Sequence, residues 1–253
     1  MRTFVFCSFK GGTAKTSSTL HIASCLVKHH KKRVLLIDFD SQANLSAGIG
    51  LGHDSLDTMV PVLQGKKKIT DVIQNTCISS LDIIPANTFL DGIETTVPLV
   101  SDLYAHERLR KYLFGLDYDF CFIDTPPSLG WLTQSAFYAA NYSIICAVPE
   151  PYSILAMNRL KDYHAELQER HSIACFGVIL SFWDDRGAVN EAFVQAIHSS
   201  FPNSIFHAKV RRDISVSRAI LQGKPVIETE PKSRASLDYQ ALSKEFILKI
   251  QGM

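Results

Sequence analysis

The sequence predicts an α/β protein: one doubly wound, mostly parallel sheet with helices on both faces. Three observations support this fold class. Short apolar strands alternate with amphipathic helices along the 253 residues, the strands are apolar at nearly every position, and no long Pro-, Gly- or Ser-rich linker divides the chain. Strands of this kind are typical of parallel sheets that are covered on both sides. We therefore expect one domain over residues 1–253.

The expected strands are short runs rich in β-branched and large apolar residues. They span residues 3–7, 33–38, 81–85, 120–124, 143–148 and 174–180. Apolar residues at three- and four-residue spacing predict helices at 16–30, 102–114, 130–140, 153–170, 187–200 and 234–250. Ligands bind such sheets at the carboxyl ends of the strands, so a site is expected in the loops after residues 7, 38 and 124.

Composition and charge exclude several classes of protein. The net charge is only +1, so any contact with nucleic acid must come from a local basic patch. The six cysteines are scattered without a C-x-x-C motif, which favours buried reduced thiols over a zinc or iron–sulfur site. No apolar run approaches the about 20 residues that span a bilayer, and the first strand leaves no room for a signal peptide. We expect a cytoplasmic protein without a membrane partner.

A phosphate-binding loop is expected between the first strand and the first helix. Two glycines there allow backbone N–H groups to turn around an anion, and the helix N-terminus adds positive potential. Lys15 can reach the β- and γ-phosphates of a nucleotide, and the Thr16 hydroxyl can ligate Mg²⁺. The loop thus predicts a nucleotide bound together with Mg²⁺, held by Lys10, Gly11, Gly12, Thr13, Ala14, Lys15, Thr16 and Ser17.

The loop departs from the general pattern G-x-x-x-x-G-K-[ST], because Phe9 and Ala14 occupy the glycine positions. The pattern K-G-G-x-x-K-[ST] fits instead, with Lys10 as an additional lysine. Only glycine visits positive φ freely. We expect Ala14 to accept helical φ and ψ in the first turn of the helix, which preserves nucleotide binding but can slow hydrolysis.

Acidic residues end two of the other strands. Asp124 precedes two prolines that stop its strand, an arrangement typical of a carboxylate that holds Mg²⁺; the plain alternative is an Asp that caps the next loop. In Asp38-Phe39-Asp40, alternation along an extended chain sends both carboxylates to one side and Phe39 to the other. An ordinary turn after a strand would also use such residues.

These motifs together resemble one family. Lys10 resembles the signature lysine of the deviant Walker A ATPases, which include ParA, MinD and the nitrogenase iron protein. Residues 38–44 resemble the switch segment D-x-D-P-Q-x-N, with Ser41 at the proline position, and residues 209–236 resemble a ParA segment. The resemblance to the ParA partition ATPases implies a P-loop NTPase fold in which Lys10 crosses a dimer interface to the phosphates on the other subunit.

The same resemblance implies the roles of the site residues. Lys10, Lys15 and Asp40 would be catalytic, with Asp40 orienting the attacking water. Thr16, Asp38 and Asp124 would hold the metal, with Asp38 near its outer coordination shell. The segment 180–186 would approach the adenine.

The function implied is a slow ATPase for plasmid or chromosome partition. ATP would join two copies into a homodimer that binds double-stranded DNA nonspecifically on the nucleoid, and a ParB-type partner would stimulate hydrolysis and release. Ser215 stands at a family arginine position and Arg211 at its proline, so the basic patch is redistributed. The DNA-binding candidates are Arg211, Arg212, Arg218, Lys224, Lys232 and Arg234. The plain alternative is a set of solvated cations paired with Asp213, Glu228 and Glu230.

Three other functions stay open. A MinD-like regulator on a membrane surface would need a basic amphipathic C-terminal helix, whereas residues 241–253 read as a helix that packs on the core. A metabolic or redox enzyme on the same scaffold would need a substrate pocket or a cysteine pair. A nucleotide-binding switch with negligible turnover is the third. Because the loop starts within ten residues of Met1, no N-terminal helix-turn-helix is expected.

Overall fold

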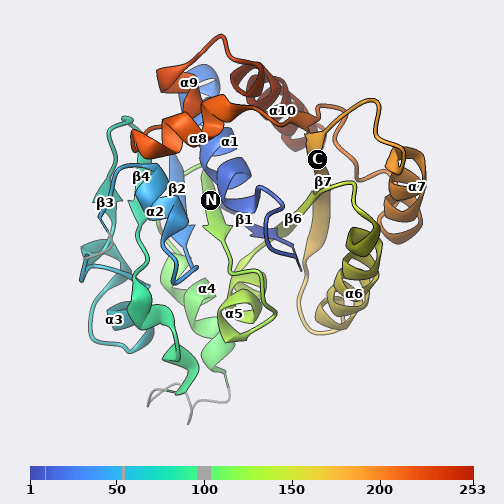
Figure 1. The fold of residues 1–253 in the computed structure, drawn as a ribbon. Helices are drawn as coiled ribbons and strands as arrows, with labels where there is room; N and C mark the ends of the chain where they lie inside the picture. The colour runs from blue at the N-terminus through green and yellow to red at the C-terminus, as the bar shows by residue number, and fades with distance from the viewer. Residues whose placement is uncertain (9, 53–54, 96–103) are drawn as a thin grey trace.

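The computed structural model describes residues 1–8, 10–52, 55–95 and 104–253. In this part of the chain the strands form one eight-stranded sheet with the order β3-β4-β2-β5-β1-β6-β7-β8 (Figure 1). Strand β3 pairs antiparallel with β4, and the other neighbours pair in parallel, which confirms the predicted mostly parallel sheet. The strands are β1 (Arg2–Cys7), β2 (Val34–Asp38), β3 (Gln74–Asn75), β4 (Leu81–Ile84), β5 (Phe120–Asp124), β6 (Tyr142–Ala147), β7 (Ala174–Trp183) and β8 (Val210–Arg211).

Helices lie on both faces of this sheet, as predicted (Figure 1). The α-helices are α1 (Lys15–His30), α2 (Asn44–Gly48), α3 (Met59–Leu63), α4 (Arg108–Leu113), α5 (Trp131–Ala139), α6 (Pro151–Gln168), α7 (Asn190–Ser200), α8 (Ile214–Leu221), α9 (Val226–Thr229) and α10 (Arg234–Gln251). Short 3₁₀ helices cover Ile69–Asp71, Thr88–Leu90, Ile93–Thr95 and Ala105–Glu107. Among the described residues, no helix is long and apolar enough to cross a membrane.

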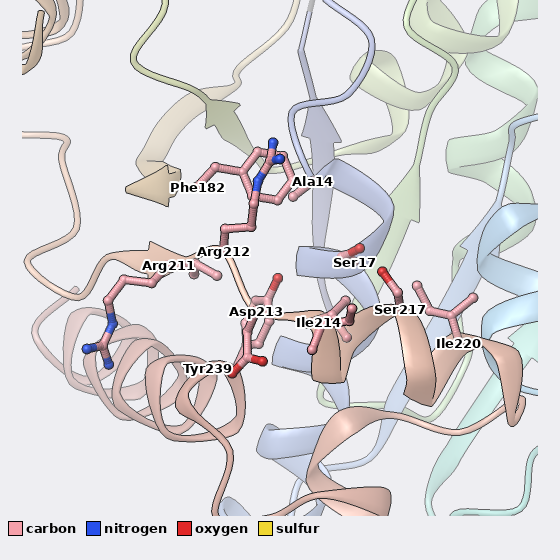
Figure 2. Close-up of a pocket in the computed structure, with 12 residues that line it drawn as sticks. Ala14, Ser17, Phe182, Arg211, Arg212, Asp213, Ile214, Ser217, Ile220 and Tyr239 are labelled. Atoms are coloured by element: carbon pink, nitrogen blue, oxygen red, sulfur yellow. The ribbon is translucent and has the colours of Figure 1, made fainter. Parts of the chain in front are cut away.

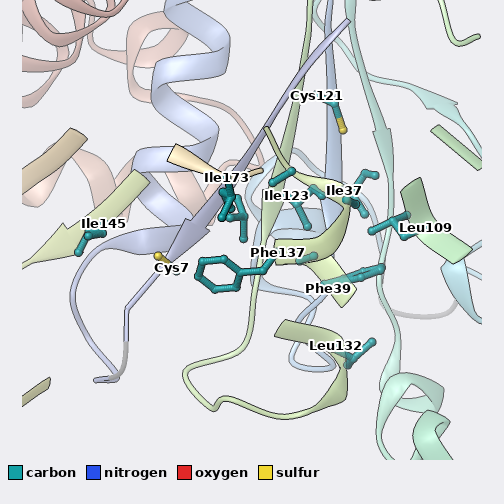
Figure 3. Packing of buried hydrophobic residues seen from close by; sticks show 14 of the residues in the cluster. Cys7, Ile37, Phe39, Leu109, Cys121, Ile123, Leu132, Phe137, Ile145 and Ile173 are labelled. Carbon is teal, nitrogen blue, oxygen red and sulfur yellow. The ribbon is translucent and has the colours of Figure 1, made fainter. Parts of the chain in front are cut away.

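Alternation along the strands divides the core into two clusters. Phe4 and Phe6 of β1 face the layer that contains α1 and α10, whereas Val5 and Cys7 face the layer that contains α4 to α7. Figure 3 shows part of the cluster on the side of α4 to α7, in which Phe137 of α5 lies near Cys7. Because every residue of β2 and β5 is buried, each of these strands contributes to both clusters.

Aromatic rings join the two ends of the chain on the α1 side. The Phe4 ring lies 5.6 Å from the Phe122 ring, 5.1 Å from Phe176 and 5.0 Å from Phe246 of α10. Burying each such side chain contributes about 1.5–3 kcal/mol to folding. As a result α10, the last helix of the chain, packs along α1, the helix that follows the phosphate loop (Figure 1).

The structure differs from the predicted elements at several places. The helix expected at 102–114 is a 3₁₀ turn followed by the short α4, and residues 102 and 103 lie outside the described part of the chain. Strand β7 continues to Trp183, beyond the predicted end at 180. The two-residue strands β3 and β8 and the helices α2, α3, α8 and α9 were not predicted, because elements this short depend on packing against the rest of the protein.

Candidate nucleotide-binding site

The loop between β1 and α1 has the open backbone that a phosphate site requires. Gly12 has φ +74°, and a side chain added at Gly11 or Gly12 would meet nothing within 4 Å. The Thr13 hydroxyl is buried and makes no hydrogen bond within the described residues. The chain therefore leaves space and an unsatisfied polar group beside the N-terminus of α1, which fits an anionic oxygen.

The expectation for Ala14 was wrong. Its φ and ψ are 60° and 27°, which is the left-handed region, and it caps α1 without a side-chain hydrogen bond. The chain must turn from the loop into α1 within one residue, and this turn imposes left-handed φ and ψ on Ala14. The Cβ of an L-residue makes that conformation cost roughly 1–2 kcal/mol, which glycine would avoid.

Lys15, Thr16 and Asp124 meet at the carboxyl edge of the sheet, as the sequence predicted. Lys15 Nζ lies 3.2 Å from Asp124 Oδ1 and also donates to the carbonyl of Thr125. The Thr16 hydroxyl donates to Asp124 Oδ2 over 2.6 Å. Asp124 is completely buried, so the cation and the hydroxyl hold its carboxylate in one orientation.

Asp38 lies beside Asp124, because β2 and β5 place the two residues in register. Burial, with a smaller contribution from Asp124, raises the pKa of Asp38 to about 7. Its carboxylate accepts hydrogen bonds from Ser46 Oγ at 2.7 Å, from Ser46 N at 2.9 Å and from Asp40 N at 3.1 Å. Two adjacent buried carboxyl groups favour the binding of a cation between them.

Asp40 lies in the turn after β2. Its side chain is mostly buried and accepts a hydrogen bond from Gln42 N at 3.1 Å. Phe39 is completely buried in the core, as alternation along the chain predicted. Asp40 is thus held at the same edge of the sheet as the phosphate loop, which fits a role toward a ligand bound there.

Lys10 binds an acid of its own chain. Its ammonium group forms an ion pair with Glu150, in the loop between β6 and α6. Both side chains keep solvent exposure, 34% for Lys10 and 49% for Glu150. No local sequence pattern indicates a role for Glu150, since its partner Lys10 is 140 positions away.

The donor set fits Mg²⁺ bound together with phosphates. A hydroxyl and two carboxylates are the oxygen ligands that this ion prefers, and Mg²⁺ usually takes few protein ligands besides phosphate and water. Within the described ranges no group of three or more His, Cys, Asp or Glu side chains is placed so that it could hold a metal ion.

One cavity adjoins the loop, and a second cavity shares part of its lining. The loop cavity, of about 370 Å³, is bounded by Ala14 and Ser17, the end of β7 and the start of α8 (Figure 2). The arginine cavity, of about 600 Å³, is lined by Glu150, Trp183 and several arginines: Arg186, Arg211, Arg212 and Arg234. Phe182 lines both cavities, so the predicted base-contacting segment 180–186 does reach the space next to the phosphate loop.

The predicted DNA-binding cations differ in how they are engaged. Arg211 is bound to Asp238, with Nε 3.0 Å from Oδ2, and Arg218 is bound to Glu230, with Nε 2.8 Å from Oε1. Both cations are thus ion-paired, as in the plain alternative, although only Arg218 has one of the acids named there, and the partner of Arg211 is Asp238 instead. Ser215 is completely buried, so its position offers nothing to a surface ligand.

The other four cations keep exposed side chains; these are Arg212, Lys224, Lys232 and Arg234. The Arg212 guanidinium lies 4.8 Å from the centre of the Phe182 ring, and Arg234 donates to the carbonyl of Arg212.

Comparison with known proteins agrees with this geometry. The AAA domain family matches residues 1–174. The chain is 50% identical to a ParA family protein of Chlamydia pneumoniae over the full length of both chains. It is 31% identical to the chromosome-partitioning ATPase Soj of Treponema pallidum, over 98% of each chain. Among solved structures, the septum site-determining protein MinD of Pyrococcus horikoshii, complexed with Mg-ADP, superposes with a TM-score of 0.80 at 26% identity, over 99% of this chain and 97% of MinD.

Proposed function

The chain belongs to the ParA family, and on that premise we propose that it is an ATP-dependent partition ATPase. ATP and Mg²⁺ join two copies, the dimer binds double-stranded DNA without sequence preference, and a ParB-type partner stimulates the hydrolysis that releases it. The observation that carries this proposal is the meeting of Lys15, Thr16 and Asp124 beside an open glycine loop.

Each residue of the site has a role in this proposal. Lys15 contacts the β- and γ-phosphates, while Thr16 and Asp124, with Asp38 behind them, hold the cation. Mg²⁺, when bound, neutralises charge on the phosphate oxygens. Asp40 orients the attacking water. The base occupies the loop cavity, which begins at Ser17, immediately after the residues that hold the phosphates.

Lys10 must exchange one anion for another in this scheme. It leaves Glu150 and contacts the triphosphate of the second copy. An exposed ion pair contributes only about 0–1 kcal/mol to stability, so breaking the Lys10–Glu150 pair costs little free energy. Nucleotide binding can thus drive association.

Sizing by light scattering with and without ATP and Mg²⁺ tests the nucleotide part of the proposal. The wild type becomes dimeric with ATP. Asp40→Ala binds ATP and stays dimeric because it does not hydrolyse, Lys10→Ala binds ATP as a monomer, and Lys15→Ala does neither. Hydrolysis by Asp40→Ala at the wild-type rate would remove that aspartate from its role.

The DNA-binding surface is proposed from the predicted cations that are exposed and form no ion pair within the described residues: Arg212 and Arg234, with Lys224 and Lys232. A surface that neutralises several phosphates loses affinity steeply as salt rises. Arg212→Ala with Arg234→Ala should lose salt-dependent DNA binding and keep ATP binding. Lys66→Ala with Lys68→Ala removes two exposed charges elsewhere and serves as the control. An unchanged salt dependence in the Arg212 and Arg234 double variant would refute the assignment.

We do not favour the membrane-surface alternative. Helix α10 buries Ala235, Tyr239, Leu242 and Phe246 in the core cluster on the α1 side of the sheet, which leaves that apolar face no freedom to enter a bilayer.

The low-turnover switch differs from a partition ATPase only in the rate of ATP hydrolysis. Phosphate release measured with the partner and DNA present would distinguish the two.

A further inference from the structure

Phe182 interrupts the regular pairing at the end of β7. The register between β7 and β8 shifts between Ser181 and Trp183, and Phe182, which lies at the shift, has φ +52°. Positive φ is rare for a bulky aromatic residue. Bulges beside functional sites redirect a side chain that regular alternation would place elsewhere. The strand accepts an unfavourable backbone at this residue, and the ring then lies between two cavities.

Both cavities are lined by Phe182, Arg211 and Arg212, so these residues form their common wall. On one side lies the loop cavity with Ala14 and Ser17, and on the other lies the arginine cavity with Arg234. In Figure 2 the Arg212 guanidinium lies against the Phe182 ring, next to Ala14. The separation of 4.8 Å is a cation–π contact.

An aromatic ring face can hold a guanidinium or a planar base, but not both. A base that enters the loop cavity from Ser17 reaches the wall at Phe182. Arg212 lines the loop cavity together with Phe182, so a base that stacks on the ring face turned to this cavity displaces the Arg212 guanidinium. The arginine cavity lies directly on the other side, where Arg234 already contacts the backbone of Arg212.

We propose that the nucleotide base and Arg212 compete for the Phe182 ring, so that nucleotide binding releases Arg212 toward a DNA phosphate. Phe182 is then the residue that stacks on the base, and Arg212 couples the nucleotide site to the DNA surface. This inference rests on the proposed function. It adds a link within one protomer, separate from dimerisation: the base is common to ATP and ADP, so Arg212 is freed in both states, and the release of DNA after hydrolysis follows from the loss of the dimer.

The affinity for Mg-ADP, compared with that for Mg-pyrophosphate, tests this competition by calorimetry. Pyrophosphate occupies the phosphate loop but carries no base. Arg212→Ala removes the competitor and should strengthen ADP binding by about threefold to tenfold, the range expected for loss of one cation–π contact. Phe182→Leu should weaken ADP binding, and Phe182→Tyr should restore it. Pyrophosphate affinity should stay constant in all three variants.

The double variant decides the mechanism. In the Phe182→Leu background, Arg212→Ala should no longer strengthen ADP binding, because the ring for which the two groups compete is gone. Weaker or unchanged ADP binding by Arg212→Ala alone overturns the inference. So does a change in pyrophosphate affinity that equals the change for ADP. Failure of the wild type to bind ADP would instead overturn the proposed function.

Reciprocity gives a second measurement. If DNA holds the released Arg212, a short DNA duplex should strengthen ADP binding to wild type, and this gain should vanish in Arg212→Ala. A gain that persists in Arg212→Ala refutes the link to DNA. Absence of any DNA binding by the wild type with ATP would refute the DNA part of the proposed function, while the ADP competition would still be decided by the variants.

Discussion

The buried histidine of α1 should make the stability of the protein depend on pH. His21 is completely buried, its ring centre lies 4.9 Å from that of Tyr239, and its Nδ1 accepts a hydrogen bond from Val226 N at 3.3 Å. Its Nε2 has no hydrogen-bond partner within the described residues. Burial lowers the pKa of His21 to about 3, because the charged imidazolium would lose its hydration.

The sign and size of the effect follow from linkage. The folded protein keeps His21 neutral down to about pH 3, whereas the unfolded chain takes up a proton below about pH 6.5. Stability is therefore lost as pH falls through the unfolded pKa. At pH 5, about 1.5 pH units below that value, the loss is about 2 kcal/mol. In a chain of this size that corresponds to a fall of roughly 4–8 °C in Tm.

Urea unfolding of wild type and His21→Asn at pH 7.5 and pH 5 measures the contribution of His21 to the pH dependence of the free energy of unfolding. Asn is chosen because its Oδ1 can still accept from Val226 N. The variant should be less stable at pH 7.5 but should lose about 2 kcal/mol less than wild type on going to pH 5. Asp38, whose raised pKa acts in the opposite direction, is present in both proteins, so its contribution cancels. Equal losses in the two proteins would refute the argument.

Two further predictions concern backbone and packing. Ala14→Gly relieves the left-handed strain and should leave stability unchanged or raise it by up to about 1 kcal/mol. Ala241→Gly, at an exposed position within α10, should cost about 1 kcal/mol. Thermal unfolding compares the two variants, and a loss of stability at position 14 as large as that at position 241 would contradict the strain at Ala14. A Cβ added at Gly177 would lie 2.3 Å from the buried ring of Phe206, so Gly177→Ala should cost about 1–3 kcal/mol in the same assay. Gly52→Ala, where a Cβ meets nothing within 4 Å, should be nearly neutral, and equal effects at the two glycines would exclude the clash.

The central strands could be predicted from sequence because they are apolar at nearly every position, which indicates strands that are buried on both faces. β2 and β5 are buried at every position and their predicted bounds agree with the structure to within one residue. The helix α8 was missed, since it depends on contacts that are distant in the chain. Asp213 caps it through Ser215 N and also accepts from Ala235 N of α10.

The site shows the same division. Lys15, Thr16 and Asp124 were predictable, because the chemistry of phosphate and Mg²⁺ requires those groups, the first two at the start of the helix after β1 and the third at the end of β5. The backbone of Ala14 was not, because residue type alone favours helical angles there. The bulge at Phe182 depends on the register of β7 against β8, which no local pattern contains.

The position of α1 also decides when during synthesis the protein can take up its nucleotide. β1 lies between β5 and β6 in the sheet, and the face of α1 beside His21 is covered by Tyr239 near the other end of the sequence. At roughly 5–20 residues per second, a ribosome needs more than about ten seconds to supply those later segments. A nascent chain carries the glycine loop from the start but lacks the scaffold that shapes it. We therefore expect ATP binding to require these later segments as well as the glycine loop.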